Sequence, residues 1–284
     1  MPDDFVVAIA SGKGGTGKTT MAANLAWVAS RSGQKVQYLD CDVEEPNGHI
    51  FLRPQITASR QVTIDVPQVD LEKCTACGQC GQICQYGAIV CIKDAVLTFE
   101  PLCHACGGCF RVCPDDAITP KPLEIGTIEY GKAGEIDFVS GQLNVGHVRT
   151  PTLIKEVKKN IRPETLAIID VPPGTSCPVV EAIKDANFVL LVTEPTPFGL
   201  NDLKLAVELV RELNLPFAVI INRFDVGNEE VEEYCKAEGI QIAAKLPDDR
   251  RIAEAYSSGK MIVRELPEYR NCFVDLVEAL EAHR

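Results

Sequence analysis

FVVAIASGKGGTGKTT, residues 5–20, is the stretch that decides the fold of this chain. Its first six residues are all apolar, as in a strand that is buried on both faces. Residues 12–19 match GxxxxGK[ST], which binds phosphate when it lies between a strand and a helix. Residues 19–31 have the apolar spacing of a helix, and residues 35–39 read as a second strand that leads into Asp40. The stretch therefore predicts a β-α-β opening around a phosphate loop.

The residue types of this loop suit nucleotide binding. Glycines let backbone N–H groups close around phosphate oxygens at the start of a helix. Lys18 supplies a cation for the β and γ phosphates, and the hydroxyl of Thr19 is a ligand for Mg²⁺. The alternative is a glycine turn that binds nothing. We expect ATP or ADP, with Mg²⁺, to contact Gly12, Lys13, Gly14, Gly15, Thr16, Gly17, Lys18, Thr19 and Thr20.

Strand and helix patterns alternate further along the chain. Residues 166–169, 188–192 and 217–221 are apolar throughout, and helical patterns such as 200–213 and 229–238 lie between or after them. Alternation of this kind predicts an α/β fold with a mostly parallel sheet flanked by helices.

A different texture interrupts this pattern from about Ile56 to Pro122, where short runs are rich in Cys, Gly and Pro. Two halves of this region repeat each other: CTACGQCGQICQYGAIV at 74–90 and CHACGGCFRVCPDDAIT at 103–119. We predict an inserted α+β domain at 59–122, with two equivalent sites. Residues 1–58 and 123–284 would then form one discontinuous domain.

Composition narrows the choice of partners and compartment. The net charge of -12 disfavours wide contact with nucleic acid or an anionic membrane. The sequence shows neither a basic leader followed by an apolar run nor about 18 consecutive apolar residues, so we expect a cytoplasmic protein. Nine of its 13 cysteines lie between Cys74 and Cys113. In a reducing compartment, metal binding is the better use for them.

Both cysteine runs have the spacing CxxCxxCxxxC of bacterial ferredoxins, in which the fourth cysteine of each run binds the other [4Fe-4S] cluster. We therefore expect two clusters with crossed ligand sets. The first set is Cys74, Cys77, Cys80 and Cys113; the second is Cys103, Cys106, Cys109 and Cys84. Zinc is the alternative, although zinc sites usually combine CxxC pairs.

One position departs from the ferredoxin pattern. Cys113 is followed by Pro114, whereas Cys84 is followed by Gln85, which removes no ligand. The cysteines outside the pattern are expected to be small buried residues, with the role of Cys177 left open: Cys41, Cys91, Cys177, Cys235 and Cys272.

KGGTGKT, residues 13–19, resembles the deviant Walker A loop of the MinD, ParA, Mrp and nitrogenase iron protein superfamily. The resemblance implies an ATPase that dimerises with itself or with a similar chain, so that Lys13 contacts the nucleotide of the facing subunit. A solvated lysine is the alternative. DCDVEEPN, residues 40–47, is similar to the first switch of that family, in which Asp42 orients the attacking water. We expect Lys13, Lys18 and Asp42 to be the catalytic residues.

Three further segments are assigned roles by the same resemblance. DVPPGT, residues 170–175, is similar to the second switch, where Asp170 assists Mg²⁺ together with Thr19 and Asp42. Asn222 and Arg223 resemble the adenine-reading position, and Pro247 and Asp248 the loop beside the base.

The chain as a whole resembles MinD-type ATPases with an inserted ferredoxin domain, which leaves three functions open. The favoured one is an ATPase whose nucleotide state controls electron transfer to a partner metalloprotein, or maturation of that partner. The second is a cluster carrier like the Mrp proteins, although those use a CxxC near the C-terminus and Cys235 and Cys272 stand alone. The third is a positioning ATPase on membrane or DNA, which the acidic tail at 271–284 disfavours.

Overall fold

The computed structural model describes residues 5–283 of the 284-residue chain. These residues form two compact units. The nucleotide unit, as we call it, contains residues up to Ser59, Ile128–Gln142 and the chain from Ile154 onward. The cysteine unit contains Arg60–Thr127 and Leu143–Leu153. Four elements contribute residues to both units: the strands β3 (Gln55–Val69), β6 (Ile118–Ala133) and β7 (Ile136–Leu143), and the helix α5 (Thr150–Lys158).

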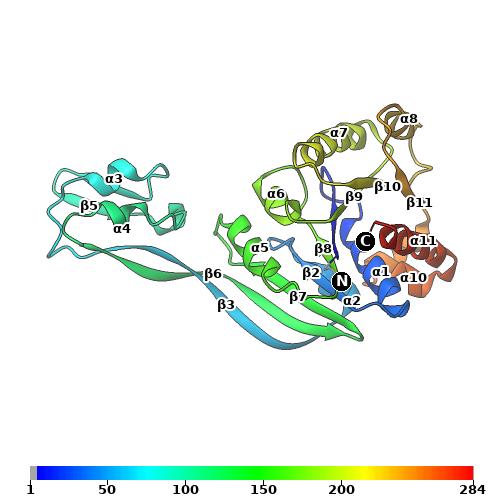
Figure 1. Ribbon diagram of the computed structural model, residues 1–284, viewed down its shortest axis with the longest axis horizontal. Coiled ribbons are helices and arrows are strands. Elements are labelled where there is room, and N and C mark those ends of the chain that lie inside the picture. The colour runs from blue at the N-terminus through cyan, green and yellow to red at the C-terminus, as the bar shows by residue number, and fades with distance from the viewer. Residues whose placement is uncertain (1–4, 284) are drawn as a thin grey trace. The chain divides into compact units, whose positions relative to one another are not determined.

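The central sheet has nine strands in the order β11-β10-β9-β1-β8-β2-β7-β6-β3 (Figure 1). Its middle strands pair in parallel, and their buried faces explain the uninterrupted apolar runs. This confirms the predicted α/β fold with a mostly parallel sheet. The strands not yet named are β1 (Phe5–Ala10), β2 (Val36–Asp40), β8 (Leu166–Asp170), β9 (Phe188–Thr193), β10 (Phe217–Asn222) and β11 (Ile242–Leu246).

Helices cover both faces of this sheet. On one face, one hydrophobic core joins alternate residues of β1, such as Val7 and Ile9, to the helices α1 (Lys18–Arg31), α2 (Gly48–Leu52), α10 (Ile262–Glu265) and α11 (Arg270–Glu281). On the other, α6 (Cys177–Ile183) packs on β1 and α7 (Pro197–Glu212) on β9. The remaining elements of the nucleotide unit are α8 (Glu230–Ala237), α9 (Arg250–Ser257) and the 3-10 helix η2 (Pro267–Tyr269).

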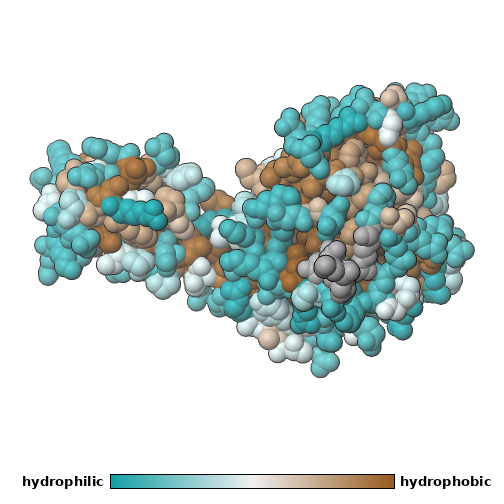
Figure 2. All heavy atoms as spheres, viewed as in Figure 1, coloured by the Kyte–Doolittle hydropathy of each residue, from teal (hydrophilic) through white to brown (hydrophobic). Residues whose placement is uncertain are grey.

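The cysteine unit has its own small core, formed by Cys80, Ile89 and Ile118 with partly buried neighbours. Helices α3 (Gln79–Ile83) and α4 (Gly108–Val112) pack on each other, and β4 (Ile89–Ile92) and β5 (Ala95–Thr98) form an antiparallel hairpin. The 3-10 helix η1 (Glu100–Leu102) precedes Cys103. Hydrophobic side chains also reach the surface of this unit (Figure 2), Leu71 and Ile92 among them.

The duplicated sequence produces a duplicated backbone. Ala76 and Ala105, which follow two residues after Cys74 and Cys103, have left-handed φ angles of 53° and 51°. Gly78 and Gly107 precede the two short helices with φ angles of 79° and 73°. A left-handed conformation costs about 1–2 kcal/mol for a residue with a side chain, so its recurrence at matching positions shows that the two loops fold alike.

Candidate functional site

The phosphate loop joins β1 to α1, the context that its motif requires. Gly17 is left-handed, with φ 97°, and a Cβ there would lie 2.7 Å from Nδ2 of Asn222. That same amide donates a hydrogen bond to the carbonyl of Thr16 at 2.9 Å. The end of β10 therefore fixes the loop. On its other side, Gly12 approaches α7 so closely that a Cβ would meet the carbonyl oxygen of Asp202 at 2.2 Å.

A cavity of about 420 Å³ opens beside this loop. Its volume is in the range of small-molecule sites. Segments that lie far apart in the sequence form its walls. The sequence-predicted residues that line it are Gly14, Gly15, Gly17, Lys18, Thr19, Thr20, Asp42, Asn222, Arg223, Pro247 and Asp248. Gly12, Lys13, Thr16 and Asp170 do not line it.

Sequence reasoning missed one wall of the cavity. Ile252, Ala253 and Tyr256 of α9, together with Ile262, present apolar surface opposite the loop. Tyr256 also packs on Phe51, with ring centroids 5.3 Å apart. Apolar and aromatic side chains suit the flat face of a base. The spacing of Ile252 and Tyr256, four residues apart just after Pro247, was the available signal.

Two aspartates at the carboxyl ends of neighbouring strands are buried beneath the loop. Asp40 of β2 and Asp170 of β8 are register partners and have no exposed surface. Asp40 accepts hydrogen bonds from the N–H groups of Gly48 at 2.8 Å and Asp42 at 3.3 Å. Burial raises the pKa of Asp40, and the neighbouring Asp170 adds to that rise. Asp40 thus fixes the backbone of the segment 42–48 that follows it.

Asp170 keeps one oxygen free. Its Oδ2 accepts a hydrogen bond from the buried Tyr38 hydroxyl at 2.9 Å, but Oδ1 has no hydrogen-bond partner among residues 5–283. Burial raises the pKa of Asp170, although Lys18, Thr19 and Tyr38 act in the opposite direction. A buried carboxylate oxygen without a donor is costly unless a cation or its water occupies that side. The donor set therefore fits Mg²⁺, with Thr19 and Asp170 facing each other.

Asp42 lies at the edge of the cavity and is partly buried. Burial raises its pKa to about 7, Asp170 adds to the rise, and Lys18 opposes it. A carboxyl group with a pKa near neutrality can hold or release a proton at physiological pH. It is therefore suited to act on a water molecule beside the phosphates.

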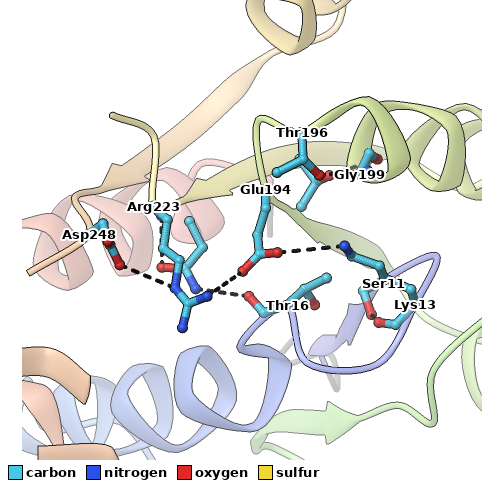
Figure 3. Close-up of polar contacts among 10 residues, drawn as sticks. Ser11, Lys13, Thr16, Glu194, Thr196, Gly199, Arg223 and Asp248 are labelled. Atoms are coloured by element: carbon cyan, nitrogen blue, oxygen red, sulfur yellow. Dashed lines mark hydrogen bonds and ion pairs between the residues drawn. The ribbon is translucent and has the colours of Figure 1, made fainter. Parts of the chain in front are cut away.

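Lys13 is held within its own chain. Its ammonium lies 3.6 Å from Oε2 of Glu194, a largely buried carboxylate that follows β9 (Figure 3). Arg223 approaches the other oxygen of Glu194 at 3.2 Å and Oδ1 of Asp248 at 3.4 Å. Glu194 thus ties the phosphate loop to the predicted base-side residues. Sequence analysis did not single it out, because a lone glutamate after a strand carries no motif.

In the cysteine unit, two separate cavities each collect four cysteines. The first is lined by Cys74, Cys77, Cys80 and Cys113, and the second by Cys84, Cys103, Cys106 and Cys109. In both cases the fourth cysteine comes from the other repeat. Each thiol of a four-iron cube binds a different iron, so ligands surround a cluster instead of converging on one ion. Residues 5–283 contain no group of three or more His, Cys, Asp or Glu side chains that could hold a single metal ion.

Backbone N–H groups point at several of these sulfurs. Ala105 and Ala117 donate to Sγ of Cys103 and Cys113 at 3.4 Å and 3.2 Å. Burial raises the pKa of Cys84, but the N–H groups of the loop after it, from Tyr86 to Ile89, outweigh burial and lower it overall. Such hydrogen bonds favour the thiolate, which is the form that binds metal. Over the second cavity, the rings of Tyr86 and His104 stack with centroids 3.7 Å apart.

The other cysteines differ in exposure. Cys41 and Cys235 are buried, Cys91 and Cys272 are partly exposed, and Cys177 is exposed at the start of α6. Within the described chain, no helix is long and apolar enough to cross a membrane.

A family model described as the CobQ/CobB/MinD/ParA nucleotide binding domain matches residues 7–262. An uncharacterized protein of Methanocaldococcus jannaschii is 33% identical over 267 residues, which cover 93% of each chain. An iron-sulfur cluster carrier protein of Aquifex aeolicus is 25% identical, covering 97% of this chain and 66% of its own.

A solved structure is similar over nearly the whole length. The septum site-determining protein MinD of Pyrococcus horikoshii, complexed with Mg-ADP, superimposes with a TM-score of 0.61 at 21% identity, covering 98% of this chain and 96% of its own. At this identity the likeness establishes the fold alone.

Proposed function

Because the chain belongs to the CobQ/CobB/MinD/ParA family of nucleotide-binding proteins, we propose that it is a Mg²⁺-dependent ATPase that carries two [4Fe-4S] clusters. In this proposal the nucleotide state controls electron transfer to a partner metalloprotein, or the maturation of that partner. The inserted residues 59–122 are a ferredoxin-like domain in this proposal, and residues 1–58 and 123–284 are the ATPase domain.

One observation carries the proposal. A single chain has a nucleotide-sized cavity at a phosphate loop, and two cavities that are each lined by four cysteines in the crossed ferredoxin order. The donor sets fit the clusters, since all eight thiols belong to loops with matching backbone conformations and sulfur-directed N–H groups. When bound, the clusters would supply one-electron chemistry.

The residues of the nucleotide unit divide the work of hydrolysis. Loop N–H groups and Lys18 hold the phosphates, and Thr19 with Asp170 holds Mg²⁺. Asp42 orients the attacking water, and the apolar α9 wall receives the base. Phosphoryl transfer depends mainly on such positioning and on neutralising charge.

Dimerisation completes the site in this proposal. Lys13 reaches the nucleotide of a facing subunit, as the resemblance to MinD-type ATPases implies. To do so, its ammonium must leave the carboxylate of Glu194, which lies 3.6 Å away in this structure. Because Glu194 also binds Arg223, it keeps a cationic partner after Lys13 departs. The release of Lys13 therefore leaves no unpaired buried charge behind.

A cluster carrier is the second candidate, and its support comes from similar proteins that are named iron-sulfur cluster carriers. A carrier gives up its cluster, whereas an electron-transfer protein retains it. Cys77 and Cys106 are exposed, so both cavities are open to solvent at one ligand. Incubation with an apo-protein acceptor distinguishes the two functions, because only a carrier loses iron and sulfide to the acceptor.

A positioning role on a membrane has less support. A membrane-binding helix needs a free apolar face, and the apolar face of α11 is buried through Phe273, Leu276, Val277 and Leu280.

The proposed function is tested by anaerobic purification of the full chain. We expect about eight irons and eight acid-labile sulfides per chain, from two cubes, together with hydrolysis of ATP that requires Mg²⁺. Zinc without labile sulfide would contradict the cluster proposal, and absence of hydrolysis under all redox states would contradict the ATPase proposal.

A further inference from the structure

Arg149 is a buried cation in the cysteine unit. Only 4% of the residue is exposed. Its Nε donates to the carbonyl of Cys103 at 2.6 Å, and its Nη2 donates to the carbonyl of Glu100 at 2.5 Å. Its Nη1 lies 3.3 Å from Nδ1 of His147. The guanidinium therefore contacts the backbone of Cys103, a ligand in the second predicted set.

No carboxylate forms an ion pair with Arg149 within residues 5–283. Glu100 contacts Arg149 only through its backbone carbonyl. Its carboxylate pairs with Lys121 at 2.8 Å instead. A buried charge without a counterion costs several kcal/mol, and a guanidinium does not lose its proton in proteins. Burial lowers the pKa of Arg149, whereas negative charge on Cys103 acts in the opposite direction. Negative charge at the second cysteine cavity would therefore compensate the buried guanidinium, which contacts the backbone of Cys103.

Among the described residues, those that line the first cavity include no lysine or arginine. Next to Cys74, the first cysteine of the other repeat, Lys73 is exposed and pairs with Asp70 at 3.6 Å. Each cavity is also lined by one aspartate, Asp115 in the first and Asp65 in the second, so these acids do not distinguish the two. Arg149, hydrogen-bonded to the backbone of Cys103, is therefore a buried charge beside the second site that the described lining of the first cavity lacks.

We infer that Arg149 raises the reduction potential of the second cluster above that of the first. This inference rests on the proposed function, because it assumes that the clusters are present. Reduction transfers one electron from an external low-potential donor to the cluster, and the site gains one negative charge. A nearby buried cation stabilises that charge in a low dielectric, where charge interactions are strongest. No proton moves, since the guanidinium stays protonated throughout.

The experiment measures both cluster potentials by redox titration followed by electron paramagnetic resonance, in the full anaerobic chain. Arg149→Met removes the charge and keeps the apolar stem, whereas Arg149→Lys keeps a charge. Arg111→Met is the matched control, because Arg111 is an exposed residue of α4 between Cys109 and Cys113. The Cys84→Ser chain, expected to lack the second cluster, identifies which signal is which.

We expect Arg149→Met to lower the reduction equilibrium constant of the second cluster at least tenfold, which is about 59 mV for one electron. The first cluster, and both clusters in Arg111→Met, should change by much less, because solvent screens an exposed charge. If Arg149→Met loses the second cluster while Arg149→Lys retains it near its original potential, the requirement for charge is also supported.

Two results would overturn the inference. One is an unchanged potential of the second cluster in Arg149→Met. The other is loss of that cluster in both Arg149 variants, which would show that the side chain only holds the loop. Failure of the proposed function looks different: the unsubstituted chain itself would then hold no iron and labile sulfide.

Discussion

At the scale of single residues, Lys13 and Lys18 belong to one loop but to different electrostatic settings. Lys18 lines the cavity, beside Asp42 and Asp170, whose pKa values it lowers. Lys13 does not line the cavity and pairs with Glu194 instead (Figure 3). Lys18 is therefore placed to contact phosphates in this cavity, whereas Lys13 would have to leave Glu194 to reach a nucleotide in the proposed dimer.

We predict that Lys18→Ala abolishes nucleotide binding, whereas Lys13→Ala and Asp42→Ala retain binding and lose hydrolysis by a factor of about 100 or more. The reason is that an interaction made only in the transition state changes kcat and not affinity. Binding of a fluorescent ATP analogue and steady-state hydrolysis measure the two effects separately. Full activity of Lys13→Ala would exclude a trans role for this lysine.

The raised pKa of Asp42 predicts a pH-dependent stability. In the unfolded chain this carboxyl titrates near 3.9, and in the folded, nucleotide-free chain at about 7. The favourable contribution of protonated Asp42 to the free energy of unfolding is fully present below about pH 4. It is lost as the pH rises through 7, because the folded state then carries a negative charge that burial disfavours. The Asp42→Asn variant carries no such charge at any pH.

We therefore expect Asp42→Asn to be more stable than the unsubstituted protein at pH 8, by about 2 kcal/mol after allowance for the exposed part of the side chain. At pH 4 the two should be nearly equal. Thermal unfolding with EDTA and without nucleotide measures this. A variant that is less stable at pH 8 would show that Asp42 makes favourable contacts as a carboxylate.

At the scale of elements, the two cysteine loops and their helices act as a pair. α3 and α4 pack on each other, and each is followed by a cysteine that lines the cavity of the other loop. The crossing ties the two halves together, so neither site is complete without the other repeat. Cys84 follows α3 and Cys113 follows α4.

We predict that Cys84→Ser damages the second cluster and spares the first, and that Cys113→Ser does the reverse. Serine is a poor ligand for iron in place of a thiolate, while its size leaves the fold unchanged. Iron content near half of the original, with opposite losses in the two resonance signals, is the expected result. If each variant instead loses the cluster of its own repeat, the crossed assignment is wrong. Cys272→Ser, far from both cavities in sequence and in the other unit, is the control.

At the scale of the molecule, continuous elements connect the nucleotide cavity to the cysteine unit. Glu45 and Asn47 line the nucleotide cavity and also a neighbouring cavity of about 450 Å³, whose other walls include Glu129 of β6 and Ser140 of β7. β6 continues into the cysteine unit. α5 begins directly after Arg149, and its last residue, Lys158, donates to the carbonyl of Glu181 in α6 at 2.6 Å. α6 follows residues 170–175, the segment predicted to be the second switch.

We predict that nucleotide shifts the cluster potentials. If ATP and reduction favour the same conformation, linkage requires that each changes the other's equilibrium by the same factor, typically about 5- to 150-fold. Midpoint potentials with ADP, with a non-hydrolysable ATP analogue and without nucleotide measure the effect. Lys18→Ala is the control, because a chain that binds no nucleotide should show no shift. Identical potentials under all three conditions, in a chain that binds the analogue, would mean that the clusters and the ATPase work independently.

What the sequence determined by itself is local. The phosphate loop and the two cysteine runs are contiguous segments, in which chemistry depends on spacing along the backbone, and so residues such as Lys18 and Cys74 could be identified before any fold was known. Their order along the chain also indicated a parallel sheet, because apolar runs of strand length are buried on both faces.

Tertiary structure alone decided the environment of these residues. The near-neutral pKa of Asp42 comes from burial and from Asp170 on another strand, and the partner of Lys13 is Glu194, which carries no motif. The α9 wall and the contact of Arg149 with Cys103 join segments that are distant in sequence. Dielectric and charge proximity act through space, with no regular relation to sequence spacing, so only the packed molecule reveals them.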